Sequence, residues 1–135
     1  MATTTATIPD RLAETLIVDT TADATSNSDV FSGITLATKI YCIKLDNTSV
    51  NAVSYFKGQI VSTNSGAYAT GTAPSIRLYV PASTYVEYIF PAGWPANLLS
   101  GSDKFCFIGT STAASTGTQS SPSGGDLKVT ILAGT

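Results

Sequence analysis

Apolar and polar residues alternate in short runs along most of the chain. In the run 39–46 (KIYCIKLD), Tyr41, Ile43 and Leu45 occupy one face and Lys44 the other. A period of two predicts a β-strand with one buried face. No run has a helical period, and β-type runs recur at 14–19, 31–36, 53–61, 76–80, 85–90, 103–109 and 127–132.

Turn-forming segments rich in Ser, Thr, Gly and Pro separate these runs. Short strands joined in this way predict an all-β fold, an antiparallel β-sandwich of jelly-roll or immunoglobulin-like type with seven to eight strands. Residues 1–13 are rich in Thr and Ala and contain Pro9, so we expect an extended N-terminal arm. Residues 14–135 then form a single domain, whose core the polar segment 113–125 does not join.

The segment SIRLYVPASTYVEYIF (75–90) predicts a hairpin around its Val-Pro-Ala bend. One register places Arg77 opposite Glu87 and Tyr79 opposite Tyr85. An ion pair and an aromatic pair in the same register favour it over a slip by one residue. A jelly roll would instead send the two strands into different sheets.

Composition excludes several classes of protein. Among 135 residues, 43% are hydrophobic and 12% are charged, which is typical of a folded chain with one core. The net charge is −2 and the cations are scattered singly, so we expect no nucleic-acid partner. The N-terminus has neither a basic nor an apolar signal region, and the uncharged stretches are too polar to span a bilayer. We therefore expect synthesis in the cytoplasm and no membrane partner.

Histidine is absent, which excludes Ser-His-Asp and Cys-His nucleophiles and the HExxH zinc motif. Ser54 and Lys57 match the S-x-x-K pattern of penicillin-binding enzymes, but the companion motifs are missing. On a strand, an offset of three places these two side chains on opposite faces. We predict no catalytic residue.

Asp19, Asp23, Asn27 and Asp29 lie close together in the sequence and carry oxygen atoms of the kind that bind Ca²⁺. Their spacing is not that of an EF-hand, and acidic residues in Ser/Thr-rich turns more often cap backbone groups. We assign no metal and no cofactor.

Three further features allow more than one interpretation. Cys42 and Cys106 are buried thiols unless their strands are adjacent, in which case a disulfide could form. Trp94 lies between prolines and could cover one end of the sandwich, contact another subunit or stack on a ligand. The Asn47-Thr48-Ser49 sequon reads as a turn rather than a glycosylation site.

The blocks KIYCIKLDNTSVNAVSYFKGQI and APSIRLYVPASTYVEYIFPAG, within residues 39–93, resemble small β-rich structural proteins of tailed-phage virions. The resemblance rests on a strand ending in Leu-Asp-Asn-Thr, a Val-Pro-Ala bend and a Phe-Pro-x-Gly edge. It implies a non-enzymatic virion protein, such as a capsid decoration (cement) protein, a head-fibre base or a tail-associated module. No site residue carries over from the family.

From this resemblance we expect a viral protein, located in the virion, that binds the major capsid protein or other virion subunits as a homo-oligomer, preferably a trimer. One alternative is a tail- or fibre-associated glycan- or receptor-binding module with loop aromatics such as Trp94, Tyr68 and Tyr55. Another is an enzyme with a carboxylate or metal site around Asp19, Asp23 and Asp29. The expected interface residues come from the arm and the loop aromatics: Thr3, Thr4, Thr5, Ile8, Pro9, Trp94 and Tyr68.

Overall fold

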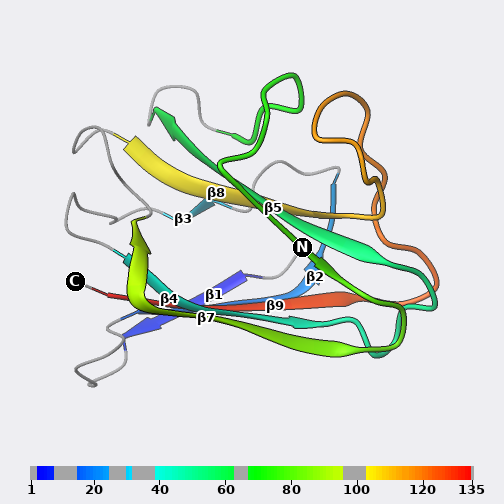
Figure 1. The fold of residues 1–135 in the computed structure, drawn as a ribbon, viewed down its shortest axis with the longest axis horizontal. Helices are drawn as coiled ribbons and strands as arrows, with labels where there is room; N and C mark the ends of the chain where they lie inside the picture. The colour runs from blue at the N-terminus through cyan, green and yellow to red at the C-terminus, as the bar shows by residue number, and fades with distance from the viewer. Residues whose placement is uncertain are drawn as a thin grey trace.

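A computed structural model of the chain is all-β, with its strands in two antiparallel sheets, as the sequence predicts (Figure 1). The structure describes residues 3–7, 15–24, 30–31, 39–62, 67–95 and 103–134. Sheet A contains, in spatial order, β1 (Thr3–Thr7), β2 (Thr15–Ala22), β9 (Leu127–Gly134), β4 (Lys39–Asp46) and β7 (Tyr85–Pro95). Sheet B contains β3 (Val30–Phe31), β8 (Asp103–Thr110), β5 (Ser54–Ser62) and β6 (Ile76–Val80).

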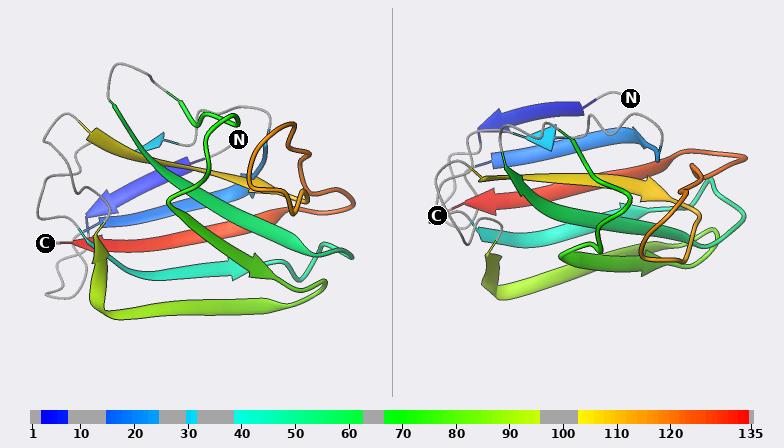
Figure 2. Two further views of the ribbon diagram at one scale, coloured as in Figure 1. Left: turned by 45° about the horizontal axis from the view of Figure 1, so that its top comes forward. Right: turned by 90° about the horizontal axis from the view of Figure 1, so that it is seen from above.

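The two sheets face each other and share one hydrophobic core (Figures 1 and 2). Alternation in the sequence explains which residues belong to this core, because every second residue of a strand points to the same side. In β9 the residues Leu127, Val129 and Ile131 point inward, as predicted. From sheet B, Phe56, Phe105 and Phe107 complete the core, and all three are essentially inaccessible to solvent.

Three phenylalanine rings form the centre of the core. The Phe56 ring lies 5.3 Å from Phe107 and 6.4 Å from Phe105, measured between centroids. Phe105 also packs onto the backbone of Gly58, where a Cβ atom would lie 2.3 Å from the Phe105 ring. Glycine is therefore required at this position of β5 by the close approach of the ring.

The predicted hairpin between residues 75–80 and 85–90 is wrong. β6 pairs with β5 in sheet B, while β7 pairs with β4 in sheet A, so the chain crosses from one sheet to the other at the bend. Glu87 has Lys44 as its register partner in place of Arg77. Local pairing was attractive because both pairs are complementary, but the strands belong to different sheets, and the register partner of Arg77 is Lys57.

The predicted alternation in β4 is also wrong at one residue. A bulge between Ile40 and Cys42 shifts the register, so that Ile40 joins the core and Tyr41 does not. Ile43 and Leu45 point inward as predicted. A bulge adds one unpaired residue to a strand and so reverses the parity on one side of it.

Thr3–Thr7, in the segment expected to form an arm, lies along β2 as an edge strand of sheet A (Figure 2). β1 is therefore a strand beyond the runs expected from the sequence, whereas β3 begins the run expected at 31–36. Ile8 and Pro9 lie outside the described residues. The division into an arm and a domain stays a prediction.

Replacing Gly58 by alanine should destabilise the fold, because the new methyl group would meet the Phe105 ring and the Ile76 side chain in a packed core. We expect a loss of about 1–3 kcal/mol in the free energy of unfolding. The control is Gly71→Ala, where a Cβ atom would meet no atom within 4 Å. Urea denaturation measures both. Equal stability of the two variants would contradict the proposed role of Gly58.

Candidate contact surface

The outer face of sheet B is covered by a loop that a buried lysine holds in place. Lys57, on β5, is 0% exposed. Its Nζ donates hydrogen bonds to the carbonyl oxygens of Thr112 (2.7 Å) and Ala114 (2.5 Å) and to Oε1 of Gln119 (2.6 Å). Three acceptors match the three N–H donors of an ammonium group. The segment 111–121 is therefore anchored over the sheet.

A second loop is held on the same face by Gln59. Its Nε2 donates to the carbonyl oxygens of Ala69 and Thr72, both at 2.8 Å, and its Oε1 accepts from the Ala69 amide at 2.9 Å. Beneath this loop, Tyr68 packs in a small apolar cluster with Cys106 and Ile108. The two loops lie beyond sheet B, on the side away from sheet A (Figure 1).

Burial, with a smaller effect from the nearby Arg77 cation, lowers the pKa of Lys57 to about 8. At neutral pH the side chain still carries the charge that its three acceptors favour. Sequence reasoning missed this role, because alternation places Lys57 and Gln59 on the polar side of β5 and gives no sign that distant loops fold over them.

Sheet A has a contrasting outer face, crossed by an apolar row of four residues. Leu16, Leu132, Cys42 and Ile89 are successive partners in the register of β2, β9, β4 and β7. Each alternates with a core residue on its own strand, so the row lies on the side away from the core. Ile89 is 64% exposed, the largest value among the exposed large hydrophobic residues of the described chain.

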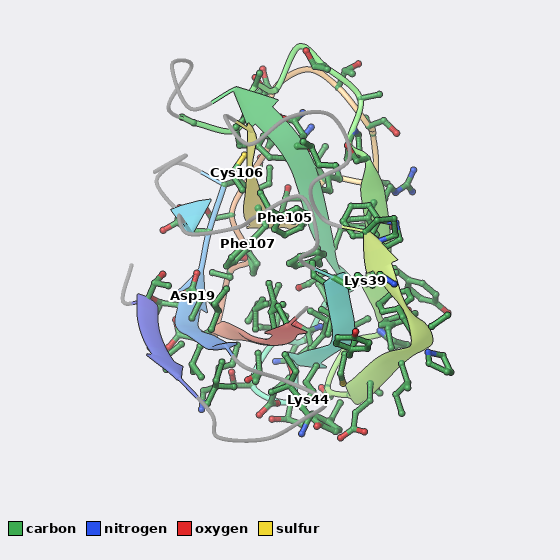
Figure 3. All side chains as sticks on the ribbon, turned by 90° about the vertical axis from the view of Figure 1, so that its left-hand side faces the viewer. Asp19, Lys39, Lys44, Phe105, Cys106 and Phe107 are labelled. Atoms are coloured by element: carbon green, nitrogen blue, oxygen red, sulfur yellow. The ribbon has the colours of Figure 1, made fainter. Side chains whose placement is uncertain are left out.

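Charges next to the apolar row balance. Lys44 Nζ lies 3.9 Å from Glu87 Oε1, and Figure 3 shows Lys44 pointing away from the core. Asp46 is the register partner of Lys128. Hydrogen bonds from Thr48 lower the pKa of Asp46, and the Lys128 cation adds a smaller effect in the same direction. Because these side chains offset one another, a partner of either sign can approach this face.

The expected interface residues do not come together. Trp94, near the end of β7, is half-buried and packs edge-on against Phe105 at 5.7 Å between centroids, so it covers the core. Tyr68 is 3% exposed under its loop. Thr3, Thr4 and Thr5 are in β1, at the far edge of sheet A from Trp94. Their roles at an interface stay predictions.

The S-x-x-K pair points in two directions, as the strand offset predicts. Ser54 Oγ donates to Asn47 Oδ1 at 2.8 Å, whereas Lys57 binds the loop on the outer face. Asn47 is buried, and its Nδ2 donates to the carbonyl oxygens of Ala52 and Pro81, so it joins two turns. The residues that follow it form a turn, in agreement with the interpretation of the sequon.

Cys42 and Cys106 are buried thiols on strands of different sheets. Cys42 is on the outer side of sheet A and Cys106 lies in the apolar cluster beyond sheet B. The core therefore separates them. This arrangement agrees with the interpretation of two buried thiols.

Asp19 is a buried carboxylate with an incomplete set of hydrogen bonds. It is 0% exposed; its Oδ1 accepts a hydrogen bond from the Thr21 amide at 3.0 Å, and its buried Oδ2 has no hydrogen-bond partner among the described residues. Burial raises the pKa of Asp19 to about 6, with a smaller contribution from the Asp23 carboxylate. No group of three or more metal-binding side chains occurs in the described residues, and Asn27 and Asp29 lie outside them.

No family model, no curated protein and no solved structure matches the chain. Within the described ranges, no helix is long and apolar enough to cross a membrane.

Replacing Lys57 by methionine should release the segment 111–121. The Thr112 carbonyl and Gln119 Oε1 would lose this donor, whereas the Ala114 carbonyl keeps a hydrogen bond from Gln119 Nε2. A buried acceptor left unpaired costs about 1–3 kcal/mol. We expect hydrogen exchange of the amides in 111–121 to accelerate at least about tenfold, while the core strands change less. Lys44→Met, on the other sheet, is the control. Unchanged exchange in the Lys57 variant would show that other contacts hold the loop.

Asp19 should make stability depend on pH. Its pKa is about 6 in the fold, against an ordinary value of 3.8 for an aspartate, so the folded state binds the proton more tightly. Stability is therefore highest below pH 4 and falls as pH rises through 6, by up to about 3 kcal/mol. Asp19→Asn should raise stability at pH 7 and flatten this slope. Denaturation between pH 4 and 7 measures it, with exposed Asp126→Asn as the control; equal slopes in the two variants would rule out Asp19 as the cause.

Proposed function

We propose that the protein is a non-enzymatic structural subunit of a virion, a capsid decoration or cement protein that binds between shell subunits. The observation that carries the proposal is the apolar row Leu16–Leu132–Cys42–Ile89 on the outer face of sheet A, in which Ile89 is 64% exposed. A sheet face with exposed apolar residues and balanced charges is suited to contact with another protein surface.

We also propose that the fold is a jelly-roll β-sandwich. This topology is supported by the strand order, which is β2-β9-β4-β7 in sheet A and β3-β8-β5-β6 in sheet B. Leaving out β1, successive strands alternate between the two sheets except at β5 and β6, as in two Greek keys wound together. Jelly rolls occur in viral capsid proteins and in lectins, so this topology is compatible with both candidate functions.

Burial of the apolar row would supply part of the binding energy. Complete burial of an isoleucine side chain contributes about 1.5–3 kcal/mol, and Ile89 retains most of its exposed surface. The flanking Lys44 and Glu87 form an exposed ion pair, which contributes at most about 1 kcal/mol and rearranges readily. The partner we propose is the major capsid protein or another virion subunit, with a homotrimer as the assembled form.

The alternative is a tail- or fibre-associated glycan- or receptor-binding module. Trp94 and Tyr68, expected as its aromatics, are largely occupied by contacts within the fold. Tyr79 is 54% exposed, and an exposed aromatic ring of this kind supports the alternative.

Replacing Ile89 by glutamate should weaken shell binding, because it places a charge at the most exposed residue of the apolar row. The measurement is cosedimentation of the purified protein with shells of the encoding virus that lack it. We expect the wild type to bind and Ile89→Glu to bind at least tenfold more weakly, with an unchanged melting temperature. Val53→Glu is the control, because Val53 is also exposed but lies on a turn away from the apolar row.

Absence of wild-type binding would contradict the decoration role. Equal binding by Ile89→Glu would instead move the contact away from sheet A. Native mass spectrometry of the same sample tests the trimer, which has three times the 13.9 kDa mass of the chain.

A further inference from the structure

One corner of the outer face of sheet B is left open by the two covering loops. There, Tyr55 of β5 is the register partner of Tyr79 of β6, and Lys57 is the register partner of Arg77. All four side chains lie on the same side, because they have the same parity on paired strands. Tyr79 is 54% exposed and Arg77 is exposed, whereas Tyr55 is half-buried and Lys57 is buried.

Two cations face each other across these strands. Like charges at directly opposed positions are unfavourable, and Arg77 contributes to the lowered pKa of Lys57. Lys57 directs its donors to loop oxygens. Within the described residues, Arg77 forms neither an ion pair nor a hydrogen bond, although its guanidinium has five N–H donors. A bound anion would relieve the repulsion and use these donors.

Tyr55 fixes the place of this guanidinium. The Cζ atom of Arg77 lies 5.2 Å from the centroid of the Tyr55 ring, within the range of a cation–π contact. Stacking of this kind occupies the face of the Tyr55 ring and leaves the in-plane N–H groups of Arg77 available. Tyr79, two residues after Arg77 on β6 and on the same face, has an exposed aromatic ring.

We propose that Arg77 and Tyr79, with Tyr55 as the positioning residue, form a binding site for an acidic saccharide, in which Arg77 binds the carboxylate and Tyr79 stacks on the sugar ring. A guanidinium and a carboxylate form paired hydrogen bonds, which give both strength and orientation. Tyrosine rings combine an apolar face with a hydroxyl group, a combination suited to a sugar ring with C–H and O–H groups. This inference is independent of the shell-binding role.

The backbone next to the site favours a saccharide over an acidic peptide. A peptide that binds a sheet edge gains most of its affinity from main-chain hydrogen bonds to that edge. On β6, the carbonyl oxygen of Tyr79 already accepts a hydrogen bond from the Tyr88 hydroxyl of β7 at 2.5 Å. The edge beside the site therefore lacks one acceptor for strand addition, whereas a sugar needs only the side chains.

The site and the apolar row lie on opposite outer faces of the molecule, because one belongs to sheet B and the other to sheet A. A subunit seated through sheet A would thus present Arg77 and Tyr79 away from the surface that holds it.

The test is a glycan array of oligosaccharides that end in uronic or sialic acids, each printed beside its neutral counterpart. The strongest acidic hit is then titrated by calorimetry. We expect acidic saccharides to bind at least tenfold more tightly than the neutral ones, and affinity to fall with added salt. Arg77→Gln and Tyr79→Ala should each weaken binding at least tenfold. Lys128→Gln and Tyr85→Ala make the same changes on sheet A and should bind as the wild type does.

Three results would overturn the proposal: no acidic saccharide binds, neutral saccharides bind equally well, or the Arg77 and Tyr79 variants bind normally. A polyglutamate peptide that binds at the same site more tightly than the saccharide would assign the site to acidic peptides instead. Arg77→Lys keeps the charge and the fold but loses the paired hydrogen bonds, so weaker binding by this variant supports carboxylate recognition. Shell cosedimentation of the Arg77→Gln variant should be unchanged.

Discussion

Strand β5 is buried on both faces, and the arrangement of the molecule follows from the way it meets this constraint. Phe56 on one face and Lys57 on the other are both 0% exposed. The inner face needs only apolar neighbours, and Phe105 and Phe107 supply them. The outer face carries an ammonium and an amide, whose burial is tolerable only with nearly complete hydrogen bonding. Two polar loops provide this, so Ser/Thr-rich segments without a core of their own become fixed parts of the structure.

The outer faces of the two sheets differ in what they present to a partner. Among the described residues, two loops are anchored over the outer face of sheet B, and Tyr79 and Arg77 remain exposed on it. Sheet A has no covering loop anchored in this way among the described residues, and its apolar row faces outward. A subunit built in this way has one broad face for a protein surface and one small polar and aromatic corner for a different kind of ligand. Both proposals rest on this asymmetry.

Local patterns in the sequence predict the strands well and their partners poorly. Period-two alternation identified the inward residues of β9 and most of those of β4, because the core selects one face of each strand. It failed at Tyr41, since a bulge leaves no clear mark in the sequence. The pairing of Arg77 with Glu87 was complementary but wrong, because complementarity between two neighbouring strands does not show that they lie in the same sheet. The roles of Lys57 and Gln59 depend on loops that are distant in sequence, and no local signal reveals them.

The position of β9 has a consequence for the order of folding. This strand lies in the interior of sheet A, hydrogen-bonded to β2 on one side and to β4 on the other. β2 and β4 are made early in translation, yet neither can complete its place in the sheet until the ribosome has released β9. Long-range pairing of this kind slows folding and leaves strand edges exposed in the meantime. The nascent chain therefore remains unfinished until synthesis has passed residue 134, and chaperones that shield open strands would act during this interval.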